Sequence, residues 1–400
     1  MVKERSPFFP GRPVSIDYFV GRANEIARIE RAIKQASYGR NENIFLTGER
    51  GIGKSSLTIA ALSVAEKNFN FTSAYCELST AKNVDEICRI IFLRLLEKSA
   101  EQGFLDKVKG VFGKYIKKIE PSLFGIRLSI DFSNDEKDIK ELRLDFLRFL
   151  INFYETLKAA KPETKGIFLA LDNLNGIAKL PELAHFFKGL VDEIASLQTQ
   201  LRFPFLLMLI GLEERMAEMQ NNQPSLPRIF DVVRLTPMNE KESTEFFNKA
   251  FSSVGTKIDT TAMDRIVRFS SGLPILLHEI GDAVFWYDSD NVISPDDSVG
   301  GIVAAADNIG RKYLERQVYE QVRSGTYKAI LQKVSKVFLT PIKRNEVLKS
   351  MSSSEIKNFD NFIRKMRGMG ILKLGERGEY LFTNNLYAAY FFLQTIQQNK

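Results

Sequence analysis

Gly48-Glu49-Arg50-Gly51-Ile52-Gly53-Lys54-Ser55 fits the phosphate-loop pattern G-x4-G-K-[ST] in full. Residues 43–47 before it read as a buried strand, and residues 56–62 after it read as the opening of a helix. The motif carries meaning only between a strand and a helix, so this context is what makes the match informative. A Gly-rich turn that matches by chance is the competing interpretation, and the strand–loop–helix order makes it the weaker one.

The residue types of this loop suit a nucleoside triphosphate. Glycines let the backbone wrap closely enough for N–H groups to point at a phosphate, and the helix N-terminus adds partial positive charge. We expect Lys54 to reach the β- and γ-phosphates and the Ser55 hydroxyl to ligate Mg²⁺. The predicted cofactors are therefore ATP or ADP with Mg²⁺. The predicted phosphate-binding residues are Gly48, Glu49, Arg50, Gly51, Ile52, Gly53, Lys54, Ser55 and Ser56.

Composition describes an ordinary soluble protein. The chain has 400 residues, 44% apolar and 26% charged, which indicates two or three globular domains. No apolar run approaches about 18 residues, and no signal peptide begins the chain, so we expect no membrane span. Cys76 and Cys88 exclude a disulfide framework and fit a reducing cytoplasm. Two histidines, His185 and His278, are too few for a His-based metal site.

Between residues 41 and 238, apolar strands alternate with helical patterns. Continuous apolar strands in this alternation are typical of a parallel sheet covered by helices on both faces. The predicted fold class is therefore α/β, with a P-loop NTPase sheet as its core. Residues 100–140, rich in Gly, Lys and Phe, interrupt the rhythm and read as an insertion. The predicted strands are 43–47, 71–78, 166–172, 205–211 and 231–235, and the predicted helices are 84–96 and 183–197.

Three further regions flank this core. Residues 1–40 read as a Pro-rich arm, packed on the body, followed by an amphipathic helix over 23–33. Residues 239–322 read as an all-helical lid with a Ser/Asp/Gly-rich loop over 288–301. Residues 323–400 read as a winged-helix domain. The predicted lid helices are 239–252, 260–270, 274–287 and 303–322; the last domain has helices 327–338, 344–349, 353–369 and 386–397 and a hairpin of 371–374 with 379–382.

Charge is concentrated in the last domain. Residues 323–400 hold 14 Lys/Arg and 5 Asp/Glu, a balance of +9 against +7 for the whole chain. A basic module of this kind favours nucleic acid, with a solvated basic surface as the bland alternative. If helix 353–369 enters a DNA groove, contacts would come from that helix and the hairpin. Binding to protein, or packing back on the ATPase, is the other interpretation. The predicted DNA contacts are Lys357, Arg364, Lys365, Arg367, Lys373 and Arg377.

A second acidic motif accompanies the phosphate loop. Asp172 ends the apolar strand 166–172, where a Walker-B carboxylate would hold Mg²⁺. The next residue is Asn173, whose amide cannot accept a proton from water, so fast hydrolysis is in doubt. Glu77, at the end of the second strand, is another polar group at this edge of the sheet.

These motifs together resemble AAA+/STAND-type P-loop ATPases, near the origin-recognition-like and transposition-regulator ATPases. The resemblance covers about residues 8–290. It rests on the phosphate loop, on Phe19-Val20-Gly21-Arg22 with Glu25 as an F-x-G-R-x-x-E entry motif, and on Gly272-Leu273-Pro274 as a lid G-x-P motif. Ile210-Gly211 and residues 229–238 resemble the sensor-1 strand and the strand that enters the lid.

The resemblance implies roles for further residues. Val20, Gly21, Arg22 and Pro274 would contact the nucleotide. Arg228 would be an arginine finger for a neighbouring subunit, or else a surface arginine, and Arg215 would be a sensor. The sensor-2 arginine expected after Gly272 is missing, because Ile275 follows Pro274; this leans towards the STAND branch. The predicted catalytic residues are Lys54, Asp172, Asn173 and Arg228.

Two functional hypotheses follow. The first is a slowly hydrolysing, nucleotide-controlled ATPase that oligomerises and acts on DNA and a partner protein. The second is a STAND-like signalling or defence switch that activates a separate effector protein without specific DNA binding. An ATP-stabilised scaffold without turnover is the bland third interpretation.

Overall fold

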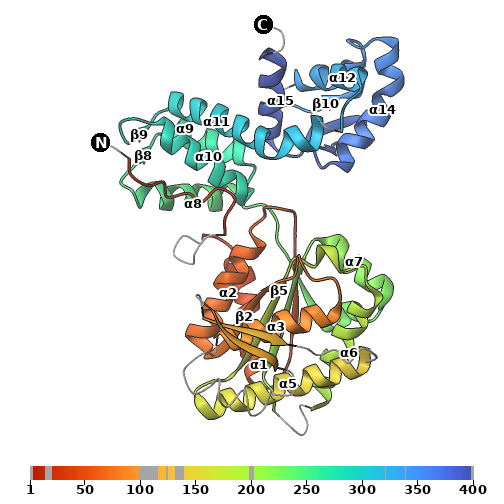
Figure 1. The fold of residues 1–400 in the computed structure, drawn as a ribbon. Helices are drawn as coiled ribbons and strands as arrows, with labels where there is room; N and C mark the ends of the chain where they lie inside the picture. The colour runs from red at the N-terminus through yellow and green to blue at the C-terminus, as the bar shows by residue number, and fades with distance from the viewer. Residues whose placement is uncertain are drawn as a thin grey trace. The chain divides into compact units, whose positions relative to one another are not determined.

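The computed structural model describes residues 3–13, 20–98, 116–122, 125–130, 139–197, 202–319, 321–337 and 339–397. The chain divides into two units (Figure 1). One is Val14–Thr236, and the other joins Met1–Pro13 to Pro237–Lys400. Each unit is a separate compact part of the structure. Among the described residues, no helix is both long enough and apolar enough to cross a lipid bilayer.

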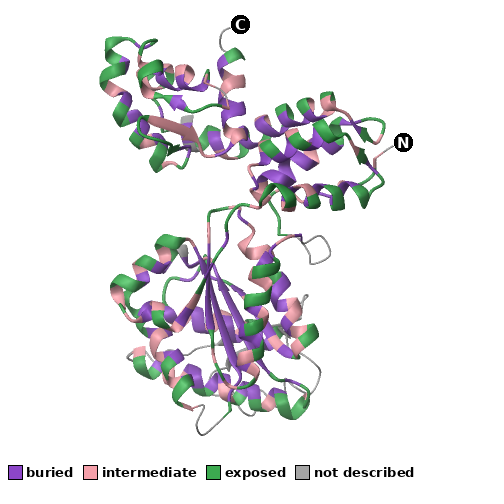
Figure 2. Cartoon of the chain, turned by 180° about the vertical axis from the view of Figure 1, so that it is seen from behind, coloured by how far each residue is buried: buried purple, intermediate pink, exposed green. Residues whose placement is uncertain are grey.

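The first unit is built on a five-stranded parallel sheet in the order β2-β5-β6-β1-β7. Every residue of β1, β5 and β6 is buried (Figure 2), which explains why these strands are continuous apolar runs. The predicted α/β class with a P-loop parallel sheet is confirmed. The strands are β1 (Asn43–Thr47), β2 (Phe71–Glu77), β5 (Gly166–Asp172), β6 (Phe205–Gly211) and β7 (Phe230–Arg234).

Helices cover this sheet and bury its apolar faces. Sequence reasoning assigned no helix to residues 139–160, where the structure has α5 (Ile139–Ala160). Its buried residues include Leu142, Phe146, Phe149 and Phe153, spaced three or four apart as on one face of a helix. The other helices are α1 (Ala23–Ser37), α2 (Lys54–Phe69), α3 (Val84–Lys98), α6 (Pro181–Leu197) and α7 (Glu213–Asn222).

The predicted insertion holds an antiparallel hairpin. Strand β3 (Ile116–Ser122) pairs with β4 (Gly125–Ile130). The rest of the predicted insertion, residues 100–115, 123–124 and 131–138, lies outside the described residues. At residue 139 the helix α5 begins, so the insertion is followed directly by a core element.

The second unit begins with a helical region. The predicted loop over 288–301 is wrong in part: it contains β9 (Val292–Ile293) and the first half of α11 (Pro295–Ile309). Ser294 and Asp297 form a capping box, and Pro295 occupies the first turn, so the helix begins eight residues before the predicted start at 303. The remaining elements are α8 (Glu240–Ser252), β8 (Lys257–Ile258), α9 (Thr260–Ser270), α10 (Pro274–Tyr287) and the π-helix η4 (Gly310–Tyr319).

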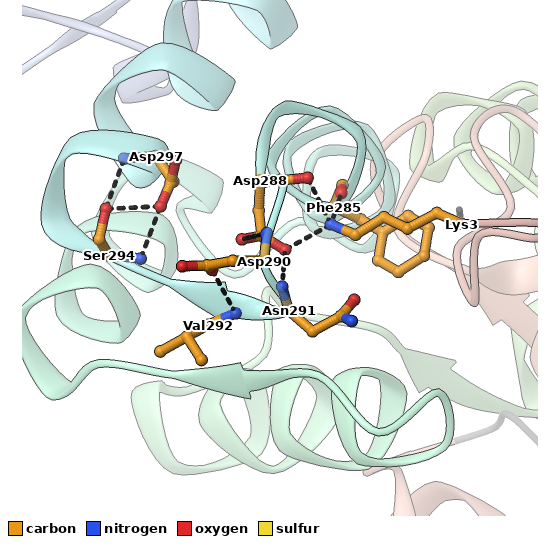
Figure 3. Close-up of polar contacts among 8 residues, drawn as sticks. All are labelled: Lys3, Phe285, Asp288, Asp290, Asn291, Val292, Ser294 and Asp297. Carbon is orange, nitrogen blue, oxygen red and sulfur yellow. Dashed lines mark hydrogen bonds and ion pairs between the residues drawn. The ribbon is translucent and has the colours of Figure 1, made fainter. Parts of the chain in front are cut away.

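The N-terminal arm belongs to this second unit and packs on α10. The Lys3 ammonium donates to the carbonyl oxygens of Phe285 (2.5 Å) and Asp288 (2.7 Å) and forms an ion pair with the Asp288 carboxylate (Figure 3). Phe8 is 4% exposed among aromatic side chains of α8 and α10. The Phe9 N–H donates to His278 Nδ1 at 3.1 Å. The arm is thus an ordered part of the helical unit.

The C-terminal part contains a small sheet together with helices. Its strands lie in the order β10-β12-β11, with both pairs antiparallel. The predicted hairpin is present, and β10 (Ile342–Lys343) adds a third strand that sequence reasoning missed. Ser352 caps α14 (Ser353–Gly368) in a capping box with Glu355. The other elements are α12 (Gly325–Ser335), α13 (Arg344–Leu348), β11 (Leu372–Leu374), β12 (Glu379–Phe382) and α15 (Asn385–Gln397).

Candidate nucleotide-binding site

The phosphate loop joins the end of β1 to the start of α2, as predicted. Gly48, Gly51 and Gly53 have φ of 148°, 78° and 92°, conformations that residues with a side chain rarely adopt. A Cβ on Gly48 would lie 2.8 Å from the Leu235 carbonyl oxygen, so this glycine is also required by space. The backbone of the loop is therefore shaped by its glycines before any ligand is considered.

Lys54 lies at the mouth of this loop. Its ammonium donates to the carbonyl oxygens of Gly48 and Glu49, both at 2.8 Å. Burial lowers the pKa of Lys54, while the carboxylates of Asp172 and Glu49 oppose that shift. These neighbours hold the cation next to the backbone that would surround a phosphate.

Ser55 and Asp172, predicted as the two metal ligands, are in contact. Ser55 Oγ, in the first turn of α2, donates to Asp172 Oδ2, at the end of β5, at 2.8 Å. Asp172 is 9% exposed. A hydroxyl and a carboxylate are the hard oxygen donors that Mg²⁺ prefers. Mg²⁺ commonly has only a few protein ligands, and water and phosphate oxygens fill its other coordination positions. These residues therefore fit the expected metal.

Tyr75 is a site residue that sequence reasoning missed. Its hydroxyl donates to the same oxygen, Asp172 Oδ2, at 2.5 Å. Burial raises the pKa of Tyr75, and its bond to the Asp172 carboxylate raises it further. The only signal in the sequence was its place on β2, two residues before Glu77, and that signal has meaning only once β2 is known to lie beside β5.

Asn173 and Glu77 form a second polar contact at this edge of the sheet. Glu77 is paired in register with Asp172 across β2 and β5. Asn173 has a left-handed φ of 66°; its N–H donates to Asp172 Oδ1 at 2.7 Å and its Nδ2 donates to Glu77 Oε1 at 2.9 Å. Burial raises the pKa of Glu77, but hydrogen bonds from Ser79 and Asn173 outweigh it and lower that pKa overall.

The entry motif lies against the phosphate loop. Arg22 has a left-handed φ of 64° and is 4% exposed. Its Nη2 donates to the Ile52 carbonyl oxygen at 3.3 Å, and its Nη1 pairs with Glu25 at 3.4 Å. Val20 is buried, whereas Phe19 lies outside the described residues. The predicted neighbours of the nucleotide, Arg22 and the loop, are thus brought together.

The two candidate arginines differ in their surroundings. Arg228 is exposed in a short 3-10 helix (Leu226–Ile229) just before β7. Arg215, in α7, donates from Nη1 to Glu218 at 2.6 Å. Arg228 is thus a surface side chain of this unit, and its predicted role remains a prediction.

The lid motif shows why its glycine is needed. Gly272 has φ of 68°, and a Cβ there would lie 2.0 Å from the Met238 carbonyl oxygen. The Met238 N–H donates to the Gly272 carbonyl oxygen at 2.8 Å. Pro274 starts α10, in the second unit, so its predicted contact with a nucleotide in the first unit stays a prediction.

The predicted DNA contacts are unequal. Lys365 is half-buried; its Nζ donates to the Gln321 carbonyl oxygen at 2.5 Å and lies 6.0 Å from the Tyr327 ring. Lys365 thus contacts other residues of the second unit itself. The other five predicted contacts are exposed: Lys357, Arg364, Arg367, Lys373 and Arg377.

Comparison with known proteins supports the sequence resemblance. Residues 18–208 match the family model described as the AAA ATPase domain. Among solved structures, the Walker-type ATPase of Pyrococcus abyssi is 14% identical, with 95% of this chain and 98% of that chain covered at a TM-score of 0.54. The ORC2 protein of Aeropyrum pernix, solved in ADPNP–ADP complexes, is 10% identical, with 98% and 96% covered at 0.56. No curated protein sequence matches significantly.

At these identities the two solved structures show only a shared fold. The evidence for a nucleotide-binding site comes from the family match. The match spans the entry motif, the phosphate loop and Asp172, the groups that the structure brings together. The resemblance to AAA ATPases is confirmed over residues 18–208, and the fold is shared with the ORC2 protein. Residues 18–208 thus match the AAA ATPase domain, and their parallel sheet and phosphate loop are those of a P-loop nucleotide-binding fold.

Proposed function

We propose that this protein binds Mg-ATP in the phosphate loop and hydrolyses it slowly, as a switch rather than a motor. The observation that carries the proposal is the contact of Ser55 Oγ with Asp172 Oδ2 at 2.8 Å, next to the loop on which Lys54 lies. One hydroxyl, one carboxylate and one ammonium thus converge where the β- and γ-phosphates would lie.

Each group has a separate task in this proposal. Lys54 exchanges its bonds to the loop carbonyls for bonds to phosphate oxygens, and N–H groups of the loop bind the same phosphates. Ser55 and Asp172 would hold Mg²⁺. The metal would neutralise charge that builds up on the phosphates during transfer. Arg22, bonded to the Ile52 carbonyl, would fix the entry segment against the bound nucleotide.

Slow turnover and assembly are part of the same proposal. Asn173, directly after Asp172, offers an amide that can orient water but cannot accept its proton. The exposed Arg228 suits an arginine finger that completes the site of a neighbouring copy. We therefore infer a nucleotide-dependent homo-oligomer in which ATP and ADP favour different conformations.

We infer that the C-terminal part is a winged helix that contacts DNA, and that the nucleotide-controlled switch also acts on a partner protein. Support comes from its charge of +9, its helix–strand–helix–helix–hairpin order and the exposed basic side chains of α14 and the β11–β12 hairpin. Binding should weaken steeply with salt, and Arg364→Ala with Arg367→Ala should reduce the salt slope by about one per lost phosphate contact. Nucleotide-dependent association with a protein, indifferent to DNA, would instead favour the STAND-like signalling switch.

The nucleotide proposal is tested with Lys54→Ala. ATP affinity should fall at least about tenfold, equivalent to about 1.4 kcal/mol, because the phosphates lose their cation. Lys67→Ala is the matched control, since Lys67 is an exposed lysine near the other end of the same helix. Calorimetry gives the affinity and phosphate release gives the rate. Unchanged ATP affinity in Lys54→Ala would refute the proposal. Tight ATP binding by the wild type, with equal and negligible phosphate release from the wild type and Lys54→Ala, would support a scaffold without turnover.

A further inference from the structure

Under the proposed ATPase function, on which this inference rests, a carboxylate is needed to activate the attacking water. Asn173 follows Asp172, and an amide cannot take a proton from an attacking water. In the structure its Nδ2 donates to Glu77 Oε1 at 2.9 Å. The missing carboxylate is therefore the direct neighbour of the amide.

We propose that Glu77, at the end of β2, is the catalytic carboxylate that orients and deprotonates the attacking water, and that Asn173 is its positioning residue. Glu77 lies in register with Asp172, and paired strands are separated by only about 4.8 Å. The carboxylate therefore comes from the strand beside the metal-binding strand rather than from the metal-binding strand itself.

The Glu77 carboxylate is fixed by three hydrogen bonds. Oε1 accepts from Asn173 Nδ2 and from the Ser79 N–H at 3.1 Å, and Oε2 accepts from Ser79 Oγ at 2.5 Å. A carboxylate has about four acceptor positions, so these bonds leave room for a water. The side chain is also exposed, so water reaches it from solvent.

The charge state agrees with this role. Although burial acts in the other direction, the bonds from Ser79 and Asn173 lower the pKa of Glu77, so the group is ionised at neutral pH. An ionised carboxylate accepts a hydrogen bond from water and takes its proton as the oxygen attacks. A bond forms between the water oxygen and the γ-phosphorus, and the bond from that phosphorus to the bridging oxygen breaks. The electron pair leaves on ADP, and Glu77 passes its proton to solvent, giving ADP and inorganic phosphate.

Glu77→Gln tests the charge without removing the hydrogen bond, because the glutamine oxygen still accepts from Asn173. We expect kcat to fall by about 100-fold or more, as for loss of a general base, with ATP affinity unchanged within about twofold. Glu97→Gln is the matched control, a surface glutamate of α3 that pairs with Arg94. Its kcat should equal that of the unsubstituted full chain.

An exchange variant separates catalysis from a structural role. In Glu77→Gln with Asn173→Asp, the amide and the carboxylate swap places, and kcat should recover at least about tenfold over Glu77→Gln alone. If Glu77→Gln lowers the melting temperature, Glu77→Asp keeps the charge and should retain measurable turnover.

The outcomes distinguish this inference from the proposed function. Wild-type turnover in Glu77→Gln, in a chain that binds and hydrolyses ATP, would overturn the role of Glu77 and leave the ATPase standing. Tight ATP binding without any turnover in the wild type would also overturn it. Lack of ATP binding by the wild type would overturn both.

Discussion

The docking of the arm makes a prediction about two residues that are far apart in sequence. Gly281, in the middle of α10, faces the Phe8 ring so closely that a Cβ would lie 2.3 Å from Cε1. Gly281→Ala alone should destabilise the second unit. Moving the ring out of a packed cluster costs about 1–3 kcal/mol, against a gain of about 1 kcal/mol from replacing a helical glycine. The net loss should be up to about 2 kcal/mol. It cannot exceed the free energy with which the arm docks, because the arm can detach instead.

The sign should reverse when the ring is absent. In a Phe8→Ala background the new Cβ enters the vacated space, so Gly281→Ala should stabilise by up to about 1 kcal/mol through helix propensity alone. The coupling energy of the double-mutant cycle is then about 1–3 kcal/mol. Gly368→Ala in α14, where a Cβ meets nothing within 4 Å, is the control and should give the same small change in both backgrounds.

The chain offers a suitable probe for this cycle. Its single tryptophan, Trp286, lies on α10 and is half exposed, so urea unfolding followed by tryptophan fluorescence reports the unit that contains Phe8. A coupling energy below about 0.5 kcal/mol, the level at which distant sites add, would refute the docking of Phe8 on Gly281.

Three further predictions concern single groups. Burial lowers the pKa of His278 to about 4, so the unfolded chain takes up a proton at a higher pH than the folded one. The free energy of unfolding should therefore fall by up to about 3 kcal/mol between pH 6.5 and 4, and urea titrations of His278→Gln should show a flatter profile; an equal slope would contradict this. Tyr75→Phe removes a bond to Asp172 and should cost about 1.5–3 kcal/mol in thermal unfolding without ligand; the loss should shrink with saturating Mg-ATP, and a constant loss would refute the shared site. Gly272→Ala should destabilise by at least about 2 kcal/mol, because strain adds to a backbone clash, whereas Gly255→Ala, with a similar φ of 70° and open space, should cost about 1 kcal/mol in the same urea assay; equal costs would contradict the clash.

The sheet and the phosphate loop could be predicted because their signals are local. A strand buried on both faces must be apolar at every position, and a phosphate loop needs its glycines and Lys54 at fixed spacing. The start of α11 was predicted wrongly because the Ser/Asp/Gly composition of 288–301 outweighed its capping box. Helix α5 was missed although its apolar spacing is present, because the glycines and lysines of 100–140 predict an irregular insertion that overlaps its first residues.

The contact between the two predicted metal ligands could be expected from the sequence, but their neighbours could not. Ser55 and Asp172 each follow a recognisable motif, so their contact could be expected. The roles of Tyr75 and Glu77 depend on β2 lying beside β5 in a particular register. Register is set by the pairing of distant segments, and no local pattern around residues 75–77 encodes it.

The arm also has a consequence for how the protein is made. Phe9 and His278 are 269 residues apart, so a ribosome working at about 5–20 residues per second needs roughly 15 s to a minute between them. The first unit, Val14–Thr236, leaves the ribosome within that interval and can fold first. Phe8 and Phe9 meanwhile remain a solvent-exposed aromatic segment on the nascent chain, the kind of sequence that chaperones bind. Completion of the helical unit is thus the step that removes Phe8 and most of Phe9 from water.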